Sequence, residues 1–346
     1  MFNEVLINKE NLLNNIEELR LKNENVKLCA MVKANAYGIG VVEVVKIIDE
    51  KVDFYGVVNF EEAKKIKNLT SKKILIVGAL DYEEEVDSSF SYACHSLQDI
   101  KFLISKNKEL NIHLKVNSGM NRFGFKSFNE FKKATCLIKK SNLILEGVFT
   151  HFATNDEYTE LQFQNFQKFM DYAKSHFPNC LIHADNSIVS KFQNHNLDMV
   201  RIGYDLYNLN NEKNKVTVKI KTKVVAIQKV KTGELVGYDY RFVANKNIKI
   251  AVFPIGYADG FCLENIGLKL QFKNQECEVL NVCMDCFMLD VTKIKIKKGD
   301  TLFILDESNS LQMFSNYQNV SVYQIMTNFS KIRAKRLIVS SNHKHI

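Results

Sequence analysis

Between residues 28 and 205, short apolar runs alternate with segments that have helical spacing and charge. The segments with helical spacing include 41–50, 61–69, 97–106, 128–139 and 157–176. Strands that alternate with helices indicate a parallel sheet, and eight such units in under about 200 residues favour a closed (β/α)8 barrel. A doubly wound open sheet is the alternative, but no Gly-x-Gly-x-x-Gly follows the first strand, which argues against its dinucleotide-binding form. The apolar runs cover residues 28–32, 54–58, 74–77, 91–94, 112–116, 144–150, 181–184 and 199–202.

The pattern changes after about residue 214. Residues 216–227 alternate apolar and polar side chains with a period of two, as do 248–252, 268–272 and 301–305. This period is typical of strands with one buried face, and no convincing helical pattern occurs there. We therefore predict an α/β barrel over residues 8–214 and a C-terminal all-β domain over 215–346, on which residues 1–7 can also pack.

Composition excludes several classes of protein. The net charge of +8 comes from lysines that are scattered among acids, and the Lys-Ile alternation at 293–298 predicts a strand with one wet face rather than a nucleic-acid site. No apolar run approaches the roughly 18 residues of a membrane span, and no secretory signal is evident at the N-terminus. Eight cysteines without such a signal indicate reduced thiols. We expect a cytoplasmic protein with no nucleic-acid or membrane partner.

Polar side chains stand where the predicted barrel strands end, which is where barrel enzymes place their chemistry. Lys33 ends the first strand, and a single lysine there is more often an ion-pair partner than a nucleophile. Ser187 and Gly203, however, lie in the loops after strands seven and eight, the usual phosphate site of this fold. A lysine together with a phosphate site suggests covalent binding of pyridoxal 5′-phosphate (PLP). The other strand-end residues are Lys115, Arg122, His151, His183, Asn186, Arg201 and Tyr204.

Residues 31–40, Met-Val-Lys-Ala-Asn-Ala-Tyr-Gly-Ile-Gly, closely resemble the PLP-lysine motif of bacterial alanine racemases, which usually has His where Ile39 stands. Further segments resemble the same family in the same order along the chain. The resemblance covers essentially the whole chain and implies the fold of that family, a PLP-binding TIM-type barrel followed by a β domain. The matching segments are 118–124, 150–153, 183–187, 200–203, 236–238, 254–260 and 282–285.

The resemblance also implies a two-base mechanism that uses Lys33 and Tyr238. Lys33 would carry the cofactor and then exchange the proton of D-alanine, while Tyr238 would exchange the proton of L-alanine on the opposite face. A free tyrosine titrates near about pH 10, so such a base must be tuned by its surroundings. In the family this tyrosine reaches into the barrel of the partner subunit, which implies a head-to-tail homodimer with shared active sites.

Other roles follow from the resemblance residue by residue. Arg201 would face the pyridine nitrogen, and because arginine does not give up its proton, that nitrogen would stay unprotonated. In some members the lysine that matches Lys115 is carbamylated. We expect no metal, because Cys283-x-x-Cys286 is a single weak pair. The implied cofactor-binding residues are Tyr37, His151, Ser187, Arg201, Gly203, Tyr204 and Tyr323, and the implied substrate-binding residues are Arg122, Tyr257 and Met284.

These observations predict an isomerase, a PLP-dependent alanine racemase that supplies D-alanine for peptidoglycan. The alternatives are a racemase of broader range that also takes serine or another amino acid, a PLP-binding protein without catalysis, and a decarboxylase of the same fold type. Asp239 stands where the family has glycine after the catalytic tyrosine, and bulky Tyr240 follows it. An ionised Asp239 close to Tyr238 would raise the pKa of that tyrosine.

Overall fold

The computed structural model describes residues 2–154, 156–185, 197–209 and 216–340. Eight parallel strands form a closed barrel in chain order, and the ring closes where the first strand pairs with the last. The predicted barrel is confirmed. The strands are β2 (Lys27–Met31), β3 (Phe54–Val57), β4 (Lys73–Ile76), β5 (Phe90–Cys94), β6 (Leu110–Lys115), β7 (Leu143–Phe149), β8 (Leu181–Asp185) and β9 (Met199–Ile202).

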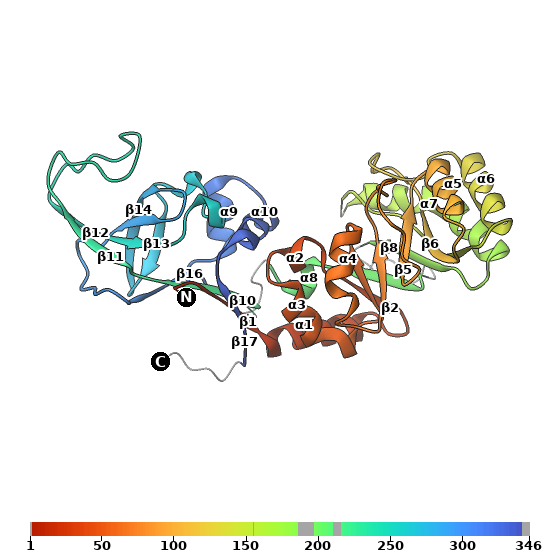
Figure 1. Cartoon of the computed structure of the whole chain (residues 1–346), viewed down its shortest axis with the longest axis horizontal. Coiled ribbons are helices and arrows are strands. Elements are labelled where there is room, and N and C mark those ends of the chain that lie inside the picture. The colour runs from red at the N-terminus through yellow and green to blue at the C-terminus, as the bar shows by residue number, and fades with distance from the viewer. Residues whose placement is uncertain (1, 155, 186–196, 210–215, 341–346) are drawn as a thin grey trace. The chain divides into compact units, whose positions relative to one another are not determined.

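Helices cover the outside of these strands, so the strands are buried on both faces and read as short apolar runs. Figure 1 shows α4 (Phe60–Lys67), α5 (Leu97–Ser105), α6 (Phe128–Lys139) and α7 (Glu157–His176) around the barrel. Three of them begin at serine or aspartate caps; Ser96, for example, accepts a hydrogen bond from the Asp99 backbone and forms a capping box. Up to residue 207 the other described α-helices are α1 (Lys9–Lys22), α3 (Val41–Ile48) and α8 (Tyr204–Tyr207), while the segment labelled α2 (Lys33–Tyr37) is a turn with left-handed backbone angles.

The rest of the chain forms two sheets. The first has the order β16-β10-β1-β17, and β1 (Glu4–Asn8) pairs with both β10 (Val218–Lys223) and β17 (Lys335–Val339). The second has the order β11-β12-β15-β14-β13, and its core includes Phe253 and Phe287 with ring centroids 5.0 Å apart. The remaining strand of the first sheet, at its edge, is β16 (Thr301–Leu305). The second sheet consists of β11 (Ala226–Val230), β12 (Ile248–Phe253), β13 (Lys269–Phe272), β14 (Gln275–Val282) and β15 (Phe287–Asp290).

Two local predictions for this part of the chain are wrong. It contains two short helices, α9 (Leu311–Gln318) and α10 (Val322–Asn328), which begin at Ser310 and Ser321. Side-chain caps and tertiary packing decide helices this short, and their periodicity is too brief to read. The Lys-Ile segment 293–298 is an irregular connection between β15 and β16 instead of a strand.

Contacts divide the chain into two compact units. The β unit contains Met1–Asn14, Ala34–Ile47 and Tyr207–Ile346, and the barrel unit contains Asn15–Lys33 and Ile48–Leu206. The domain boundaries drawn from the sequence stay a prediction. Within the described part of the chain, no helix has the length and apolar character that a membrane crossing requires.

Candidate active site

Lys33 begins a turn whose backbone is left-handed. The four residues 34–37 have φ angles between 52° and 56°, although none of them is glycine. Each such residue costs about 1–2 kcal/mol, so this turn stores strain directly after the lysine. Asn35 holds the turn by accepting a hydrogen bond from the Val41 backbone at 2.9 Å. Strain of this kind persists only where the surrounding structure enforces it, and it is common at functional sites.

Two cations lie buried where the barrel strands end. Lys115 is the last residue of β6 and Arg201 lies in β9, and both are at most 5% exposed. The ring of Phe149, at the end of β7, lies near both: its centroid is 5.8 Å from Lys115 Nζ and 4.7 Å from the Arg201 guanidinium carbon. Arg201 Nη2 also donates to the Thr150 carbonyl at 2.7 Å. An aromatic face attracts cations, so Phe149 helps to hold positive charge at this rim.

The other residues predicted for the barrel rim follow the strand ends as expected. His151 comes after β7 and is half-buried, while Gly203 and Tyr204 come directly after β9. Arg122 lies in the exposed loop after β6. Because the carboxyl ends of parallel strands meet at one edge of a barrel, these side chains share one rim. Asn186 and Ser187 lie outside the described residues.

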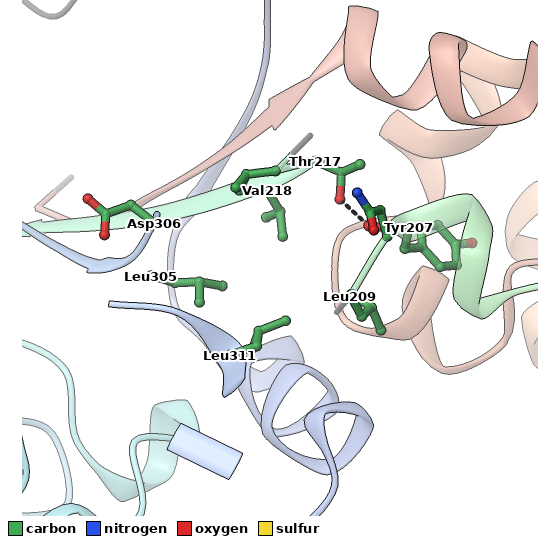
Figure 2. Close-up of a pocket in the computed structure, with 9 residues that line it drawn as sticks. Tyr207, Leu209, Thr217, Val218, Leu305, Asp306 and Leu311 are labelled. Carbon is green, nitrogen blue, oxygen red and sulfur yellow. Dashed lines mark hydrogen bonds between the residues drawn. The ribbon is translucent and has the colours of Figure 1, made fainter. Parts of the chain in front are cut away.

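Tyr37 and Tyr323, both predicted phosphate ligands, lie close together in the β unit. Their ring centroids are 5.9 Å apart, and Tyr37 also packs on Tyr207 at 5.1 Å. Tyr207 is held in turn, because Thr217 Oγ1 donates to its carbonyl at 2.6 Å. Figure 2 shows this hydrogen bond beside a small pocket that Val218 and other apolar side chains line. The three tyrosines therefore form one ordered cluster.

Tyr238, the predicted second base, is 69% exposed on the β unit. Asn281, a buried residue of β14, donates through Nδ2 to the carbonyls of Val236 and Tyr238 at 2.8 and 3.1 Å. Gly237, with φ of 72°, lies so close that a Cβ there would be 2.5 Å from Asn281 Cγ. The backbone of the tyrosine is thus fixed while its side chain stays accessible. The Asp239 carboxylate faces Arg241 at 3.7 Å, which offsets its charge beside the tyrosine.

The predicted substrate ligands Tyr257 and Met284 lie on adjacent segments of the β unit. The Tyr257 backbone donates to the Cys283 carbonyl at 3.0 Å, and the Ala258 backbone donates to the Met284 carbonyl at 2.9 Å. Both side chains are exposed, 42% for Tyr257 and 58% for Met284. Cys283 directly follows β14, the strand that contains Asn281, so the segments of Tyr238 and Tyr257 are both held by hydrogen bonds near the end of this strand.

The barrel rim fits PLP, the cofactor that the resemblance implies. PLP offers an aldehyde that a primary amine can hold covalently, together with anionic oxygens, and the rim supplies Lys33 and the cations Lys115, Arg122 and Arg201. One buried polar atom there also lacks a partner: His95 Nδ1 makes no hydrogen bond with any described residue, while Nε2 lies 2.9 Å from the Gly78 carbonyl. Burial lowers the pKa of His95, and the charges of Lys115 and Arg122 add to this effect.

Sequence reasoning missed several residues that the structure connects to the site. His113 is not among the residues predicted from the sequence, yet its imidazole is fully buried and lies 2.8 Å from that of His183. Asn281 and Glu146 are likewise absent from the predicted site residues. One signal was available: His113 and Lys115 are two residues apart on β6, so their side chains point to the same face of the strand. Among the described residues no group of three His, Cys, Asp or Glu side chains is placed to hold a metal ion.

Comparison with known proteins gives a consistent result across the chain. Family models described as the N-terminal and the C-terminal domain of alanine racemase match residues 7–211 and 217–338. The alanine racemase of Fusobacterium nucleatum is 34% identical over 358 aligned positions, which cover 96% of this chain and 98% of that protein. The structure of the Bacillus anthracis alanine racemase with bound L-Ala-P has a TM-score of 0.90 at 25% identity and covers 98% of this chain and 95% of that one. A histidine racemase from Leuconostoc mesenteroides shares the fold, with a TM-score of 0.86 at 23% identity over 98% of each chain.

Proposed function

Because the chain belongs to the alanine racemase family, whose members are PLP-dependent isomerases, we propose that it interconverts L-alanine and D-alanine by a two-base mechanism. The observation that carries this proposal is the extent of the family match, which continues through residues 217–338. That part of the chain contains Tyr238, Tyr257 and Met284. A protein that only bound PLP would need the barrel alone. We further propose that the D-alanine serves peptidoglycan synthesis; the cytoplasmic location stays a prediction.

The chemistry divides between two faces of the substrate. When bound, PLP supplies the electron sink that makes the α-proton of an amino acid acidic enough to remove. Lys33 would hold the cofactor through its side-chain amine, and that amine, when free, would exchange the α-proton on the D face. Tyr238 would exchange the proton on the L face, so each face of the α-carbon would have its own acid or base. A positioned acid or base of this kind contributes about 10²–10⁴-fold to the rate.

The remaining residues bind and orient. Arg201 would hold the cofactor ring nitrogen by donating a hydrogen bond to it, because a guanidinium keeps its protons and can only donate. Tyr37 and Tyr323, together with Ser187, Gly203 and Tyr204, would hold the phosphate, and His151 would contact the cofactor ring. Arg122, Tyr257 and the Met284 backbone N–H bind the substrate carboxylate. Because the Tyr238 side chain is exposed on the β unit, it is accessible to the active site of a partner subunit in a homodimer.

The first experiment is incubation of the PLP-loaded protein with L-alanine in D2O, followed by chiral analysis and α-proton NMR. D-alanine that carries deuterium at the α-carbon is the expected product. A parallel run with L-serine measures the breadth of the substrate range, for which a single methylene or hydroxyl difference is worth only about 1–3 kcal/mol. Bound cofactor without exchange of the α-proton would refute the proposal and favour a PLP-binding protein without catalysis.

Two variants separate the roles of the bases. Lys33→Ala should lose the covalently bound cofactor, as measured by absorbance and intact mass. Tyr238→Phe should keep the cofactor but lose racemisation by about 10²–10⁴-fold, whereas the exposed neighbour Tyr240→Phe should stay close to wild type. Covalent cofactor in the Lys33→Ala protein would contradict the assignment of the lysine.

Mixing the two inactive variants tests the shared site. In a dimer whose sites combine Lys33 of one subunit with Tyr238 of the other, each mixed dimer contains one intact site. Random exchange of subunits should then restore about a quarter of the wild-type rate. If both bases belong to one chain, mixing restores nothing, and the dimer proposal fails while the racemase proposal remains.

A further inference from the structure

A continuous row of polar side chains crosses the interior of the barrel. It starts at Glu146 of β7, passes through His113 of β6 and His183 of β8, and ends at Arg201 of β9. His113 Nε2 lies 3.0 Å from Glu146 Oε2, His113 Nδ1 lies 2.8 Å from His183 Nε2, and Arg201 Nη1 bonds to His183 Nδ1. Both imidazoles are fully buried. The function proposed above uses only the last member of this row.

The direction of every hydrogen bond in the row follows from Arg201. A guanidinium has donors and no acceptor, so Nδ1 of His183 must accept. A neutral imidazole that accepts through one nitrogen donates through the other, so His183 Nε2–H donates to Nδ1 of His113. By the same rule His113 Nε2–H donates to the Glu146 carboxylate. A protonated His113 would point a second donor at His183, so the row is consistent only with two neutral rings in the same tautomer.

The charges around the rings favour this state. Burial, followed by the charge of Arg201, lowers the pKa of His183 well below its ordinary value. Burial also lowers the pKa of His113, although its bond to Glu146 opposes the shift. The carboxylate is itself kept ionised: burial acts against it, but the bonds from His113 and Lys73 hold the pKa of Glu146 at about 2. Among the described residues, the charges that act on these two histidines are those of Arg201, Glu146 and Lys73.

The barrel makes room for the row at one glycine. Gly147 of β7 lies opposite His113 in the strand register. A Cβ at this position would come within 2.1 Å of His113 Nδ1 and 2.5 Å of its Cε1. Real Cβ contacts are never so short, and packed interiors leave no slack to absorb them. Any larger residue would therefore displace the imidazole from the row, so the steric fit of the ring depends on this glycine.

The far end of the row is anchored at the other end of the barrel. Glu146 lines a cavity of ≈ 440 Å³, bordered by Lys27, Lys73 and Leu181, the first residues of three strands. Glu146 forms an ion pair with Lys73 and accepts from Ser91 Oγ at 2.5 Å. The carboxylate therefore has partners on both sides, and only its bond to His113 points along the row.

We propose that Glu146, His113 and His183 are positioning residues, which orient the Arg201 guanidinium and hold it as a fixed donor toward the cofactor ring nitrogen. The last step of this inference rests on the proposed function, because it requires PLP at the barrel rim. The first steps concern the protein alone. If the row is broken, His183 can change tautomer and point an N–H at Arg201. The guanidinium must then turn, and the ring nitrogen loses its fixed partner.

The tautomers can be read directly by ¹⁵N NMR of the PLP-loaded protein labelled at histidine, with single substitutions to assign the signals. Both rings should be neutral, carry their proton on Nε2, and show no titration between about pH 5.5 and 9, where an ordinary histidine titrates. A proton on Nδ1 of either ring, or a titration in this range, would refute the hydrogen-bond directions assigned to the row. This readout needs no turnover, so a wild-type protein that fails to racemise alanine refutes the proposed function and leaves this test intact.

Gly147→Ala tests the effect on the site, because it displaces His113 and removes no charge. The His183 signal should lose its single tautomer, the absorbance of the bound cofactor should become pH-dependent, and kcat should fall about 10–100-fold with little change in KM. Glu146→Gln should change the His183 tautomer, the cofactor absorbance and kcat in the same direction but by smaller amounts. Asp53→Asn is the matched control, since Asp53 lines the same cavity but pairs with Arg20. Altered tautomers with wild-type kcat and absorbance would show that the row serves packing only.

Discussion

Asp259 offers the sharpest test of how the β unit holds its predicted substrate ligands. Asp259 ends the short turn that begins at Tyr257. Its carboxylate is fully buried and accepts four hydrogen bonds. Oδ1 accepts from the Arg333 backbone at 3.2 Å and from Arg333 Nε at 2.7 Å. Oδ2 accepts from the Gly256 backbone at 3.1 Å and from Arg333 Nη2 at 2.8 Å. We predict that Asp259→Asn loosens this turn.

The size of the effect follows from these four bonds. An asparagine of the same shape keeps one acceptor oxygen and points an N–H group at the donors that faced the other. One backbone bond and one charged bond are then lost, worth about 0.5–1.5 and 1.5–3 kcal/mol. The Arg333 side chain is 61% exposed, so water replaces part of the second bond. We therefore expect the free energy of unfolding to fall by about 2–3 kcal/mol.

The pH dependence has a definite sign. Burial alone would raise the pKa of Asp259, but the bonds from Arg333 and Gly256 outweigh burial and lower it below the ordinary value of 3.8. A lowered pKa contributes stability above the unfolded-state value, and that stability is lost as the pH falls through the folded-state value. The difference in the free energy of unfolding between Asp259→Asn and wild type should therefore stay constant from about pH 8 to pH 5. It should become smaller only in stronger acid.

Urea unfolding followed by far-UV circular dichroism measures this difference, since the chain has no tryptophan. The control is Glu276→Gln, which removes a carboxylate from an exposed pair with Lys269 at 3.6 Å and should change stability by under about 0.5 kcal/mol. In racemase assays Asp259→Asn should raise KM for alanine more than it lowers kcat. A loss below about 0.5 kcal/mol, or one that grows on acidification toward pH 5, would refute the reasoning.

Two further predictions concern the turns that carry the two proposed bases. Gly38→Ala should destabilise the protein by about 2 kcal/mol or more, because Gly38 has φ of 94° and a Cβ there would lie 2.3 Å from the Met326 carbonyl oxygen; an unchanged midpoint of thermal unfolding would contradict this. Asn281→Ala should lower kcat about tenfold while cofactor absorbance stays as in wild type, because the Tyr238 turn loses two hydrogen bonds. Asn247→Ala, which removes only an exposed loop contact to Thr232, is the control, and equal losses in both variants would argue against a specific role for Asn281.

The barrel could be predicted because buried parallel strands and amphipathic helices leave different periods in the sequence. The two helices α9 and α10 could not, because elements of eight and seven residues depend on serine caps and on the core that they meet. The alternation of lysine and isoleucine at 293–298 predicted a strand, but this segment pairs with none of the described strands. Local pattern records which side chains face inward, but a strand also needs a neighbour with free backbone groups.

The sequence by itself determined the residues of the candidate site. Motifs that contain Lys33, Arg201 and Tyr238 are contiguous stretches, and their chemistry can be read without coordinates. Only the tertiary structure decided which side chains support them. The contacts of Asn281 with the Tyr238 turn, and of Glu146 with His113, join segments that are tens of residues apart. Such pairs leave no period in the chain, because the strand register of the folded barrel and sheet, rather than sequence spacing, sets their distance.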